Sequence, residues 1–329
     1  MNIAVFIPFI IVFLLIIFSI FSNSKNKINI NYEKINNKDI EKYKNLILNN
    51  ELLAKYRKSY KKCQIIGGII WIIFILVGII LLVTKGIFII HVLAILGLFV
   101  FILIPNIAST KYNKVYKNEI IKNLMLANNM EYYPDQGMSI EDYRYAKFEY
   151  FDRYHSNDLI KGKVNNIDYI LADVHTEDRY EDSDGDTHYR TIFRGSVSTL
   201  KMPKNLNSFI YIVNNKSVAF SKKYLINIDN EEFEKIFDIY SDNDVLAMRI
   251  LTPDVTNSIL DLTNETGIHT EIKIFNNIIY FRFYTGDLFS PSINDIDKEA
   301  TNIAFYFKLI EGINIIMKNI LDVIEEVEL

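Results

Sequence analysis

Two adjacent stretches of sequence decide the architecture of this 329-residue chain: QIIGGIIWIIFILVGIILLVT at residues 64–84 and IFIIHVLAILGLFVFILI at residues 87–104. Neither stretch contains Asp, Glu, Lys or Arg, and the second contains His91. As a helix, each is about 27–31 Å long, which is enough to cross the hydrocarbon core of a bilayer. Joined by Lys85 and Gly86, they predict a transmembrane helical hairpin over residues 64–105.

A third apolar run, from Ile3 to Ser22, lies at the start of the sequence and also lacks charge. A cleaved signal peptide is an alternative interpretation of such a run. Only Met1 and Asn2 precede it, however, so the basic leader of a signal peptide is missing, and Ser19–Ser22 makes a poor cleavage site. We therefore expect an uncleaved transmembrane anchor at residues 1–23.

The charges around the hairpin predict its orientation. Residues 23–63 contain eleven basic and four acidic side chains, whereas the turn between the two predicted membrane helices contains only Lys85. Further lysines follow the hairpin at Lys111, Lys114, Lys117 and Lys122. Positively charged loops stay in the cytoplasm. We therefore expect a multi-pass protein of the cell (plasma) membrane, with its N-terminus outside, a basic cytoplasmic helix at residues 24–63 and its C-terminal domain in the cytoplasm. The lipid bilayer is its first predicted partner.

The composition excludes several classes of protein. The single Cys excludes a disulfide scaffold and zinc sites built from clustered cysteines. The 36 basic and 40 acidic side chains give a net charge of -4, so nothing indicates a nucleic-acid partner. The sequence contains no phosphate-binding loop, dinucleotide glycine pattern or nucleophile elbow, and we expect no cofactor.

Beyond the hairpin, residues 106–131 are predicted to continue as a stalk helix, and residues 132–293 alternate between short strands and helices. Strands at Ile167–Arg179 and Tyr189–Met202 flank an acidic turn that contains Gly185. A second pair, Glu271–Phe275 and Ile278–Tyr284, flanks an Asn-Asn turn. Because strands joined by short turns pair antiparallel, we expect a cytoplasmic antiparallel α+β domain at residues 132–293.

Helical patterns lie among these strands and after them. One covers Asn230–Tyr240, and another covers Pro253–Thr266, where Pro is suited to the first turn and Gly267 to the end. Residues 294–329 predict a long C-terminal amphipathic helix. Its apolar residues recur at alternating spacings of four and three: Tyr306, Ile310, Ile313, Met317, Ile320, Ile324 and Val327.

This regular seam has two interpretations. It can form a coiled coil, either between two copies of the chain or against the stalk. Alternatively, it is the buried face of a helix docked on its own domain. We favour docking, because further apolar residues such as Ile303, Phe307 and Leu321 widen the stripe.

Several segments between about residues 110 and 291 form a set that is specific when taken together: Tyr133-Pro134 through Gly137, Asn157–Lys163, Asp173–Glu177, Ile192–Gly195, Phe233–Phe237, Tyr240–Asp244, Ala247–Pro253 and Leu288–Pro291. With them the chain resembles an uncharacterised bacterial membrane-protein family, catalogued as domain of unknown function 3137. The resemblance implies a basic helix, a membrane hairpin and a cytoplasmic α+β domain, and it supplies no activity. The anchor predicted at residues 1–23 departs from the family's single hairpin.

Two sets of residues are candidates for chemistry. Asp182, Asp184 and Asp186 alternate around Gly185 and offer carboxylates to a hard cation such as calcium. Their spacing departs from that of an EF-hand loop, so we favour a solvated hairpin tip and expect no metal. Within the segments that carry the resemblance, Asp158, His175 and Arg249 are the candidate catalytic residues.

We therefore predict a membrane-anchored interaction or scaffolding module, which binds a protein partner or self-associates through its C-terminal helix. The alternative is a membrane-tethered enzyme or small-ligand sensor with a site in the α+β domain. This alternative requires a pocket in which Asp158, His175 and Arg249 converge.

Overall fold

The computed structural model describes residues 34–85, 87–215 and 221–326. These residues fall into two compact units, the first formed by residues 47–116 and the second by residues 34–46 together with residues 117–326. The apolar run predicted as an N-terminal anchor and Val327 of the predicted seam lie outside the described residues, and the side chain of His91 is likewise outside them.

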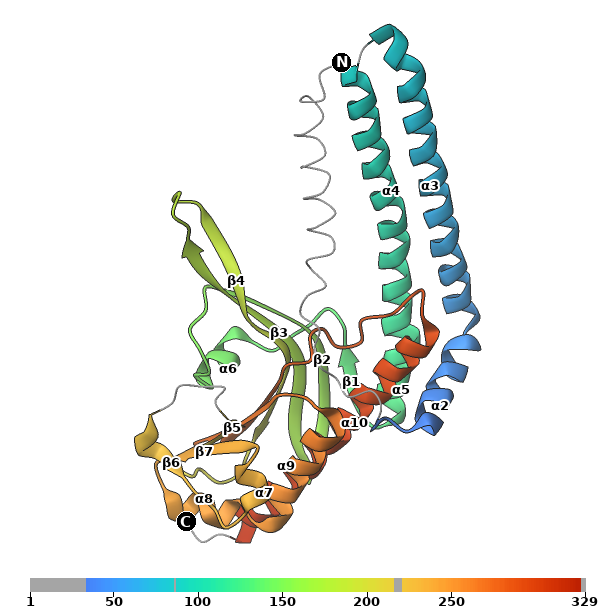
Figure 1. The fold of residues 1–329 in the computed structure, drawn as a ribbon. Coiled ribbons are helices and arrows are strands. Elements are labelled where there is room, and N and C mark those ends of the chain that lie inside the picture. The colour runs from blue at the N-terminus through green and yellow to red at the C-terminus, as the bar shows by residue number, and fades with distance from the viewer. Residues whose placement is uncertain (1–33, 86, 216–220, 327–329) are drawn as a thin grey trace. The chain divides into compact units, whose positions relative to one another are not determined.

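The first unit is a pair of long helices, α3 (Glu51–Lys85) and α4 (Ile87–Val115), which run side by side in opposite directions (Figure 1). Both are long and apolar enough to span a membrane. A glycine allows their close approach, because a Cβ on Gly97 would lie only 2.8 Å from the ring of Trp71. The Trp71 ring also stacks on Phe101, with ring centroids 5.8 Å apart.

The second unit is built on one antiparallel sheet in which nine strands are described, in the order β1-β2-β3-β4-β9-β8-β5-β7-β6 (Figure 1). The strands are β1 (Glu131–Tyr133), β2 (Arg153–Val164), β3 (Ile167–Glu181), β4 (Thr187–Lys201), β5 (Phe209–Asn214), β6 (Leu225–Ile226), β7 (Phe237–Ser241), β8 (Thr270–Phe275) and β9 (Ile278–Phe283). The predicted α+β class and both predicted strand pairs are confirmed.

Asparagines make two of the tight turns. Asn276 joins β8 to β9 with a φ of 55°, and Asn165 and Asn166 join β2 to β3 with φ values of 49° and 63°. Asn tolerates positive φ because its short polar side chain bonds locally, and positive φ at both central residues matches the twist of a two-residue hairpin. These local choices fix the register of the strands that carry the site described below.

Short helices and two long ones complete the second unit. The helices are α2 (Asn37–Leu48), α5 (Lys122–Ala127), α6 (Ile140–Tyr145), α7 (Glu231–Glu234), α8 (Asp244–Ile250), α9 (Pro253–Thr266) and α10 (Ile296–Glu326), with a 3₁₀ turn at Lys222–Tyr224. As predicted, Pro253 begins α9 and Gly267 ends it, in the left-handed conformation with a φ of 67°.

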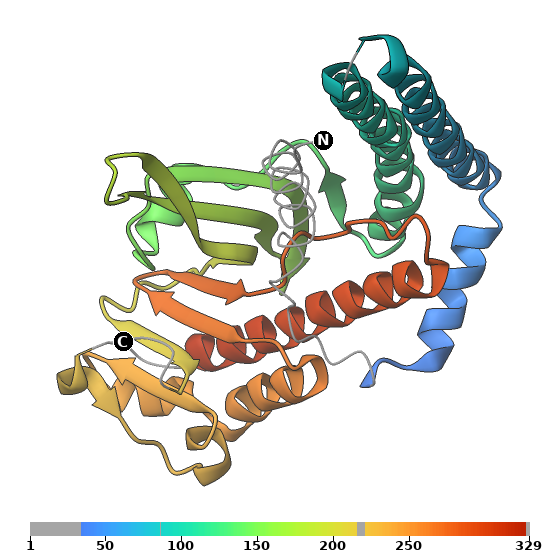
Figure 2. The same ribbon diagram turned by 45° about the horizontal axis from the view of Figure 1, so that its top comes forward.

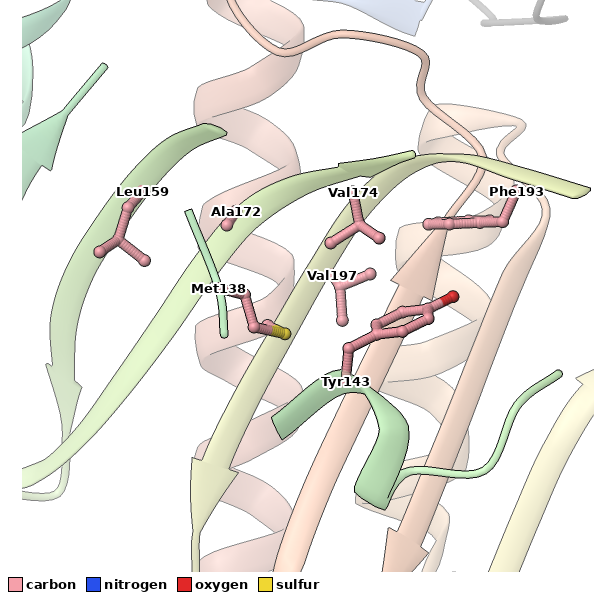
Figure 3. Packing of buried hydrophobic residues seen from close by; sticks show 7 residues of the cluster. All are labelled: Met138, Tyr143, Leu159, Ala172, Val174, Phe193 and Val197. Carbon is pink, nitrogen blue, oxygen red and sulfur yellow. The ribbon is translucent and has the colours of Figure 1, made fainter. Parts of the chain in front are cut away.

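The sheet is covered on both faces. Helix α6 lies on one face, where Tyr143 packs over Val174, Val197 and Phe193 (Figure 3). Helices α9 and α10 lie on the other face (Figures 1 and 2). The described residues of the apolar seam of α10, from Tyr306 to Ile324, are all buried in this unit. The docked interpretation of the seam is therefore confirmed, and the seam is not exposed for a coiled coil.

One predicted helix differs from the structure, and another contains a π-helical turn. In the segment Asn230–Tyr240, only Glu231–Glu234 is helical, and Phe237–Ser241 is strand β7. The rings of Phe233 and Phe237 are in contact across the junction between helix and strand, tilted and with centroids 4.8 Å apart. Their spacing of four residues therefore marks a real contact, but the helix that this spacing predicts does not continue to Tyr240. The predicted stalk is helical as far as Ala127, and it contains a π-helical turn at Tyr116–Ile121 between α4 and α5.

Candidate functional site

The structure separates the three residues predicted from the sequence as a catalytic set. Asp158 lies on β2 and His175 on β3, which are neighbouring strands. Arg249 lies on α8, which follows β7 near the opposite end of the strand order, and its side chain is exposed. The pocket that a shared catalytic role requires is therefore not formed by these three residues, and only Asp158 lies in a buried polar cluster.

Asp158 occupies a β-bulge in β2. The register between β2 and β3 shifts between Asn157 and Ile160, and Asp158 itself has a φ of 56°. Its backbone N–H donates to the carbonyl of Pro134 at 3.2 Å instead of to β3. A bulge re-aims the side chain of the extra residue. Here it places a fully buried carboxylate on the sheet.

The carboxylate of Asp158 is saturated with donors. Lys117 donates its ammonium to both oxygens, at 2.7 and 2.6 Å. The hydroxyl of Tyr132 donates to one oxygen, and the side-chain amide of Asn157 donates to the other at 2.6 Å. These bonds use the acceptor sites that a carboxylate offers. Asp158 is therefore held as a structural ion pair, with Lys117 supplied by the π-helical turn that follows α4.

A second buried acid, Asp173 on β3, lies beside the first. It accepts the backbone N–H of Leu288, in the loop between β9 and α10, and the hydroxyl of Ser196 on β4 lies 3.4 Å from its other oxygen. Ser196 in turn bonds Thr285 at 2.7 Å. We call Asp158, Asp173 and Lys117 the carboxylate cluster. It ties β2, β3, β4 and the loop before α10 to the turn after α4.

The carboxylate cluster contains two acidic side chains and one basic side chain. Burial raises the pKa of Asp158, and the nearby Lys117 only partly opposes this. Burial also raises the pKa of Asp173 well above its usual range, and the charge of Asp158 adds to the rise. Each acid disfavours ionisation of the other, as expected for carboxylates that share a low-dielectric site. Asp158 and Asp173 therefore bind a proton more readily than exposed carboxylates do. Both carboxylates are engaged in bonds within the chain, so neither is positioned as a general base.

Close packing at β4 supports this arrangement. A Cβ on Gly195 would lie 1.9 Å from the carbonyl oxygen of Phe283, so a larger residue cannot fit there without moving β9. The next side chain, Arg194, forms a two-pronged ion pair with Asp287 at 2.9 and 2.5 Å. Asp287 also contributes to the raised pKa values of Asp158 and Asp173, since its negative charge lies close to both.

His175 lies two residues from Asp173, on the same face of β3. Its Nε2 is 2.9 Å from the hydroxyl of Thr191 and 4.0 Å from the carboxylate of Glu177. Partial burial lowers its pKa, and the nearby Glu177 opposes that shift. These contacts are made within β3 and with β4, and none of them is with the carboxylate cluster.

In the acidic turn between β3 and β4, the carboxylate of Asp182 accepts hydrogen bonds from within the turn. Asp182 accepts the backbone N–H groups of Asp184 and Asp186, at 3.0 and 2.9 Å, and bonds His188 at 2.6 Å. Asp184 and Asp186 are exposed. Among the described residues, no group of three or more His, Cys, Asp or Glu side chains is arranged to hold a metal ion.

Sequence reasoning missed a second buried charged site, on the α6 face of the sheet. Arg282 of β9 bonds Glu149, in the loop after α6, and its Nε lies 3.4 Å from Glu271 of β8. Hydroxyls of Tyr143 and Tyr211 donate to Glu149 and Glu271 at 2.6 and 2.9 Å. We call Arg282, Glu149 and Glu271 the arginine network. A signal was present in the sequence, because Glu271, Lys273 and Arg282 fall on one face of otherwise apolar strands.

The arginine network is balanced in charge and enclosed by rings. The guanidinium of Arg282 lies over Phe193 and Phe148, at 4.3 and 4.8 Å from the ring centroids. Burial would raise the pKa of Glu271, but the pKa is lowered, because hydrogen bonds from His269 and two tyrosine hydroxyls and the positive charge of Arg282 outweigh burial. Burial lowers the pKa of the adjacent Lys273 to about 8. This network holds α6 and its following loop on the sheet.

Comparisons with known proteins agree with the family predicted from the sequence. The model of the family described as "Protein of unknown function (DUF3137)" matches residues 191–329. The resemblance is confirmed over this part of the chain. The matched residues include most of β4 and all later elements. They contain Glu271, Arg282 and the loop whose Leu288 bonds Asp173.

No curated protein matches the chain. Among solved structures, the crystal structure of the mycobacterial trehalose monomycolate transport factor A is similar, with 8% sequence identity and a TM-score of 0.37. The similarity covers 64% of this chain and 94% of that chain. A likeness at this level carries no argument about function.

Proposed function

We propose that the α3–α4 hairpin spans the cell membrane and that the α+β domain works on its cytoplasmic side as an interaction module. The observation that carries this proposal is the surface of the two helices. Large apolar side chains are exposed along the length of both: Ile65, Ile66, Ile69, Ile72, Ile73, Leu76, Val77, Ile79 and Ile80 on α3, and Val92, Ile95, Leu96, Phe99, Ile102, Leu103 and Ile107 on α4.

Such a surface is not compatible with water. Soluble monomers rarely expose contiguous apolar patches of more than a few hundred Å². Within a bilayer the same side chains need no protein cover, and each helix satisfies its own backbone hydrogen bonds. Packing between α3 and α4 uses the small residue Gly97 against Trp71, as is common for helices that meet in lipid.

The ends of the apolar stretches support a cytoplasmic domain. Exposed lysines lie just before the stretch in α3, at Lys58, Lys61 and Lys62, and just after the stretch in α4, at Lys111 and Lys114. Between these positive ends Arg57 bonds the hydroxyl of Tyr112, which joins the two helices. Basic residues at this end favour its retention in the cytoplasm.

Interaction is the better-supported role for the domain. The predicted catalytic residues do not converge, and the carboxylates of the cluster are engaged in bonds within the chain. The domain does present a two-stranded arm, in which Asp178–Glu181 of β3 pairs with Thr187–Arg190 of β4 and extends beyond the pairing with β2 and β9 (Figure 1). Because the seam of α10 is buried, this proposal does not use that helix for self-association.

The membrane part of the proposal is testable with one reactive thiol. Cys63 is the chain's only cysteine, so Cys63→Ser provides a thiol-free background. Tyr150→Cys in that background places a thiol on the domain at a position that is 99% exposed. We expect the protein to resist extraction from membranes by alkaline carbonate. We also expect a membrane-impermeant maleimide to label the thiol only after the cells are permeabilised; labelling in intact cells would place the domain outside.

The interaction part is testable by photo-crosslinking in cells. A benzophenone amino acid replaces Tyr180 on the arm, which is 46% exposed, or Met248 on α8, which is 53% exposed. We expect a discrete crosslinked species of defined mass from the arm and none from α8. If neither position gives a species above the monomer in the full-length chain, the module does not bind a partner through the arm.

A further inference from the structure

A groove of about 1330 Å³ lies in the second unit, between α2 and α10. Its end walls are the β2–β3 turn and the turn before β1. This volume exceeds the 300–1,000 Å³ typical of small-ligand sites. The groove is separate from the carboxylate cluster and from the arginine network, whose residues do not line it.

The two helical walls are held firmly in place. The ring of Tyr43 on α2 stacks on Phe307 of α10, with centroids 5.7 Å apart. At the same end, Lys44 forms an ion pair with Asp297 at 2.7 Å. The groove is therefore preformed, so a ligand does not have to separate α2 from α10.

The floor of the groove is mostly apolar. Tyr169 is 2% exposed, and its ring covers Gly162, where a Cβ would lie 2.5 Å from the ring. The hydroxyl of Tyr169 donates to the sulfur of Met130 at 3.4 Å. Ile310 of α10 also lines the floor. A hydrocarbon chain lying on this floor would be removed from water, which is favourable.

Most charged groups of the groove that form no salt bridge among the described residues are acceptors. Asp39 on α2 and Glu311 on α10 both line it, and neither forms a salt bridge with a described residue. The side-chain oxygen of Asn314, one turn along α10 from Glu311, is buried without a hydrogen-bond partner among the described residues. Burial and the charges of these two carboxylates raise the pKa of Tyr43 to about 12, which shows that both lie near its ring.

The basic side chains at the rim do not offset these acceptors. Of the lysines that line the groove, Lys163, Lys308 and Lys318 are paired with Asp168, Glu265 and Asp322, at 3.3, 3.2 and 2.6 Å. The ammonium of Lys161 lies over the ring of Tyr133, 5.2 Å from its centroid. The groups without a salt bridge among the described residues are therefore one lysine, Lys161, against three lining carboxylates, Asp39, Glu131 and Glu311. The groove therefore favours a cation with several N–H donors.

We propose that the α2–α10 groove binds a small aliphatic polyamine, with ammonium groups on Asp39 and Glu311, a further N–H on Asn314 and the methylene chain on the apolar floor. Opposite walls supply the two carboxylates, so a ligand with spaced ammonium groups matches them better than a single inorganic cation does. This site is independent of whether α3 and α4 cross a membrane.

The test is isothermal titration calorimetry of spermidine into the full-length chain, held in uncharged phosphatidylcholine nanodiscs at physiological salt. Hydrogen bonds between charged groups are among the strongest in proteins, so we expect Asp39→Asn or Glu311→Gln to weaken binding by about tenfold or more. Asn314→Leu should weaken it by a smaller factor. Glu232→Gln is the matched control, because it removes an exposed carboxylate on α7, outside the groove.

Two comparison ligands complete the experiment. We expect 1,8-octanediol, which has a similar length and no charge, to bind far more weakly than spermidine, and Mg²⁺ at the same charge concentration not to displace it. The proposal is overturned if the wild-type chain binds no spermidine. It is also overturned if Asp39→Asn combined with Glu311→Gln binds as tightly as wild type while retaining its circular dichroism spectrum.

Discussion

The two faces of the same sheet carry buried charges that are arranged in opposite ways. On the α6 face, the arginine network places one guanidinium between Glu149 and Glu271, and aromatic rings enclose it. On the α10 face, the carboxylate cluster sets Asp158 and Asp173 against the one ammonium of Lys117. The first holds the pKa of a buried acid down, and the second lets the pKa values of two buried acids rise.

Because of this difference, the arginine network stabilises the fold as a buried ion pair, whereas the stability of the carboxylate cluster depends on protonation. A buried ion pair costs desolvation, which close geometry and further hydrogen bonds offset. The arginine network meets that condition, since Tyr211 and Tyr284 both donate to Glu271. In the carboxylate cluster, only Asp158 has the close ion pair and the further hydrogen bonds that offset desolvation. Asp173 has the N–H of Leu288 and a hydroxyl at 3.4 Å, and it faces the negative charge of Asp158.

The largest effect is expected from Arg282→Met, which removes the cation of the arginine network. Glu149 and Glu271 are then left buried without a counter-charge, and breaking such a pair costs about 3–5 kcal/mol. Urea-dependent pulse proteolysis of the full-length chain measures the free energy of unfolding of the domain. Arg249→Met is the control, because this arginine is exposed on α8. A loss no greater than that of the control would mean that the network does not hold α6 on the sheet.

Lys117→Met should have the next largest effect, about 3 kcal/mol at neutral pH, because it leaves Asp158 buried without its ammonium. The pKa of Asp158 is already raised, so this acid accepts a proton as the pH falls and the loss should shrink towards pH 4. Arg282→Met should show no such recovery. The double variant Lys117→Met, Asp158→Asn should regain most of the lost stability at pH 7; if it does not, Lys117 acts through contacts other than this carboxylate.

The pH dependence of stability sharpens the comparison further. A raised pKa means that the folded chain holds the proton more tightly than the unfolded chain does. The contribution of Asp173 is therefore complete below its unfolded pKa of about 4 and is lost as the pH rises towards the folded value. For Glu271, whose pKa is lowered, stability is present above the unfolded value and is lost as the pH falls.

Asp173→Asn should therefore flatten the decline in stability on the neutral side, and Glu271→Gln should remove the decline on the acid side. Each unit of pKa difference corresponds to about 1.4 kcal/mol. Pulse proteolysis at pH values between 4 and 8 provides both curves. Asn keeps an acceptor for the N–H of Leu288, so the substitution tests the charge of Asp173 and not only its bond. Parallel curves for wild type and Asp173→Asn would show that this carboxyl does not titrate in that range.

Local patterns in the sequence were enough to predict much of the fold. The uncharged runs predicted α3 and α4, the Asn-Asn turn predicted the β8–β9 hairpin, and Pro253 with Gly267 predicted both ends of α9. Each of these signals acts over a few residues, through backbone geometry or through apolar periodicity. The strand at Phe237–Ser241 was missed, because a pair of Phe residues spaced by four fits a helix and also fits a helix-to-strand junction.

The buried charged sites could not be predicted in the same way. Lys117 and Asp158 are 41 residues apart, and Glu149 and Arg282 are 133 residues apart. Their pairing depends on the strand order, in which β9 inserts beside β4, and on a bulge that turns Asp158 inwards. The sequence did place Asp158 among the candidates. What it lacked was the partner, and the partner decides whether a buried acid is a catalyst or an ion pair.

The smallest effect is expected where the same kind of charge pair lies in water. On the β3–β4 arm, Arg190 contacts Asp178 at 2.9 Å, and the side chain of Arg190 is 70% exposed. Water and salt screen such a pair, so Arg190→Gln should change the free energy of unfolding by no more than about 0.5 kcal/mol. Pulse proteolysis with and without 1 M NaCl measures this. A loss comparable to that of Lys117→Met would show that ion pairs, and not only strand pairing, hold the arm in place. An exposed ion pair would then contribute as much stability as the buried pair of Lys117 and Asp158.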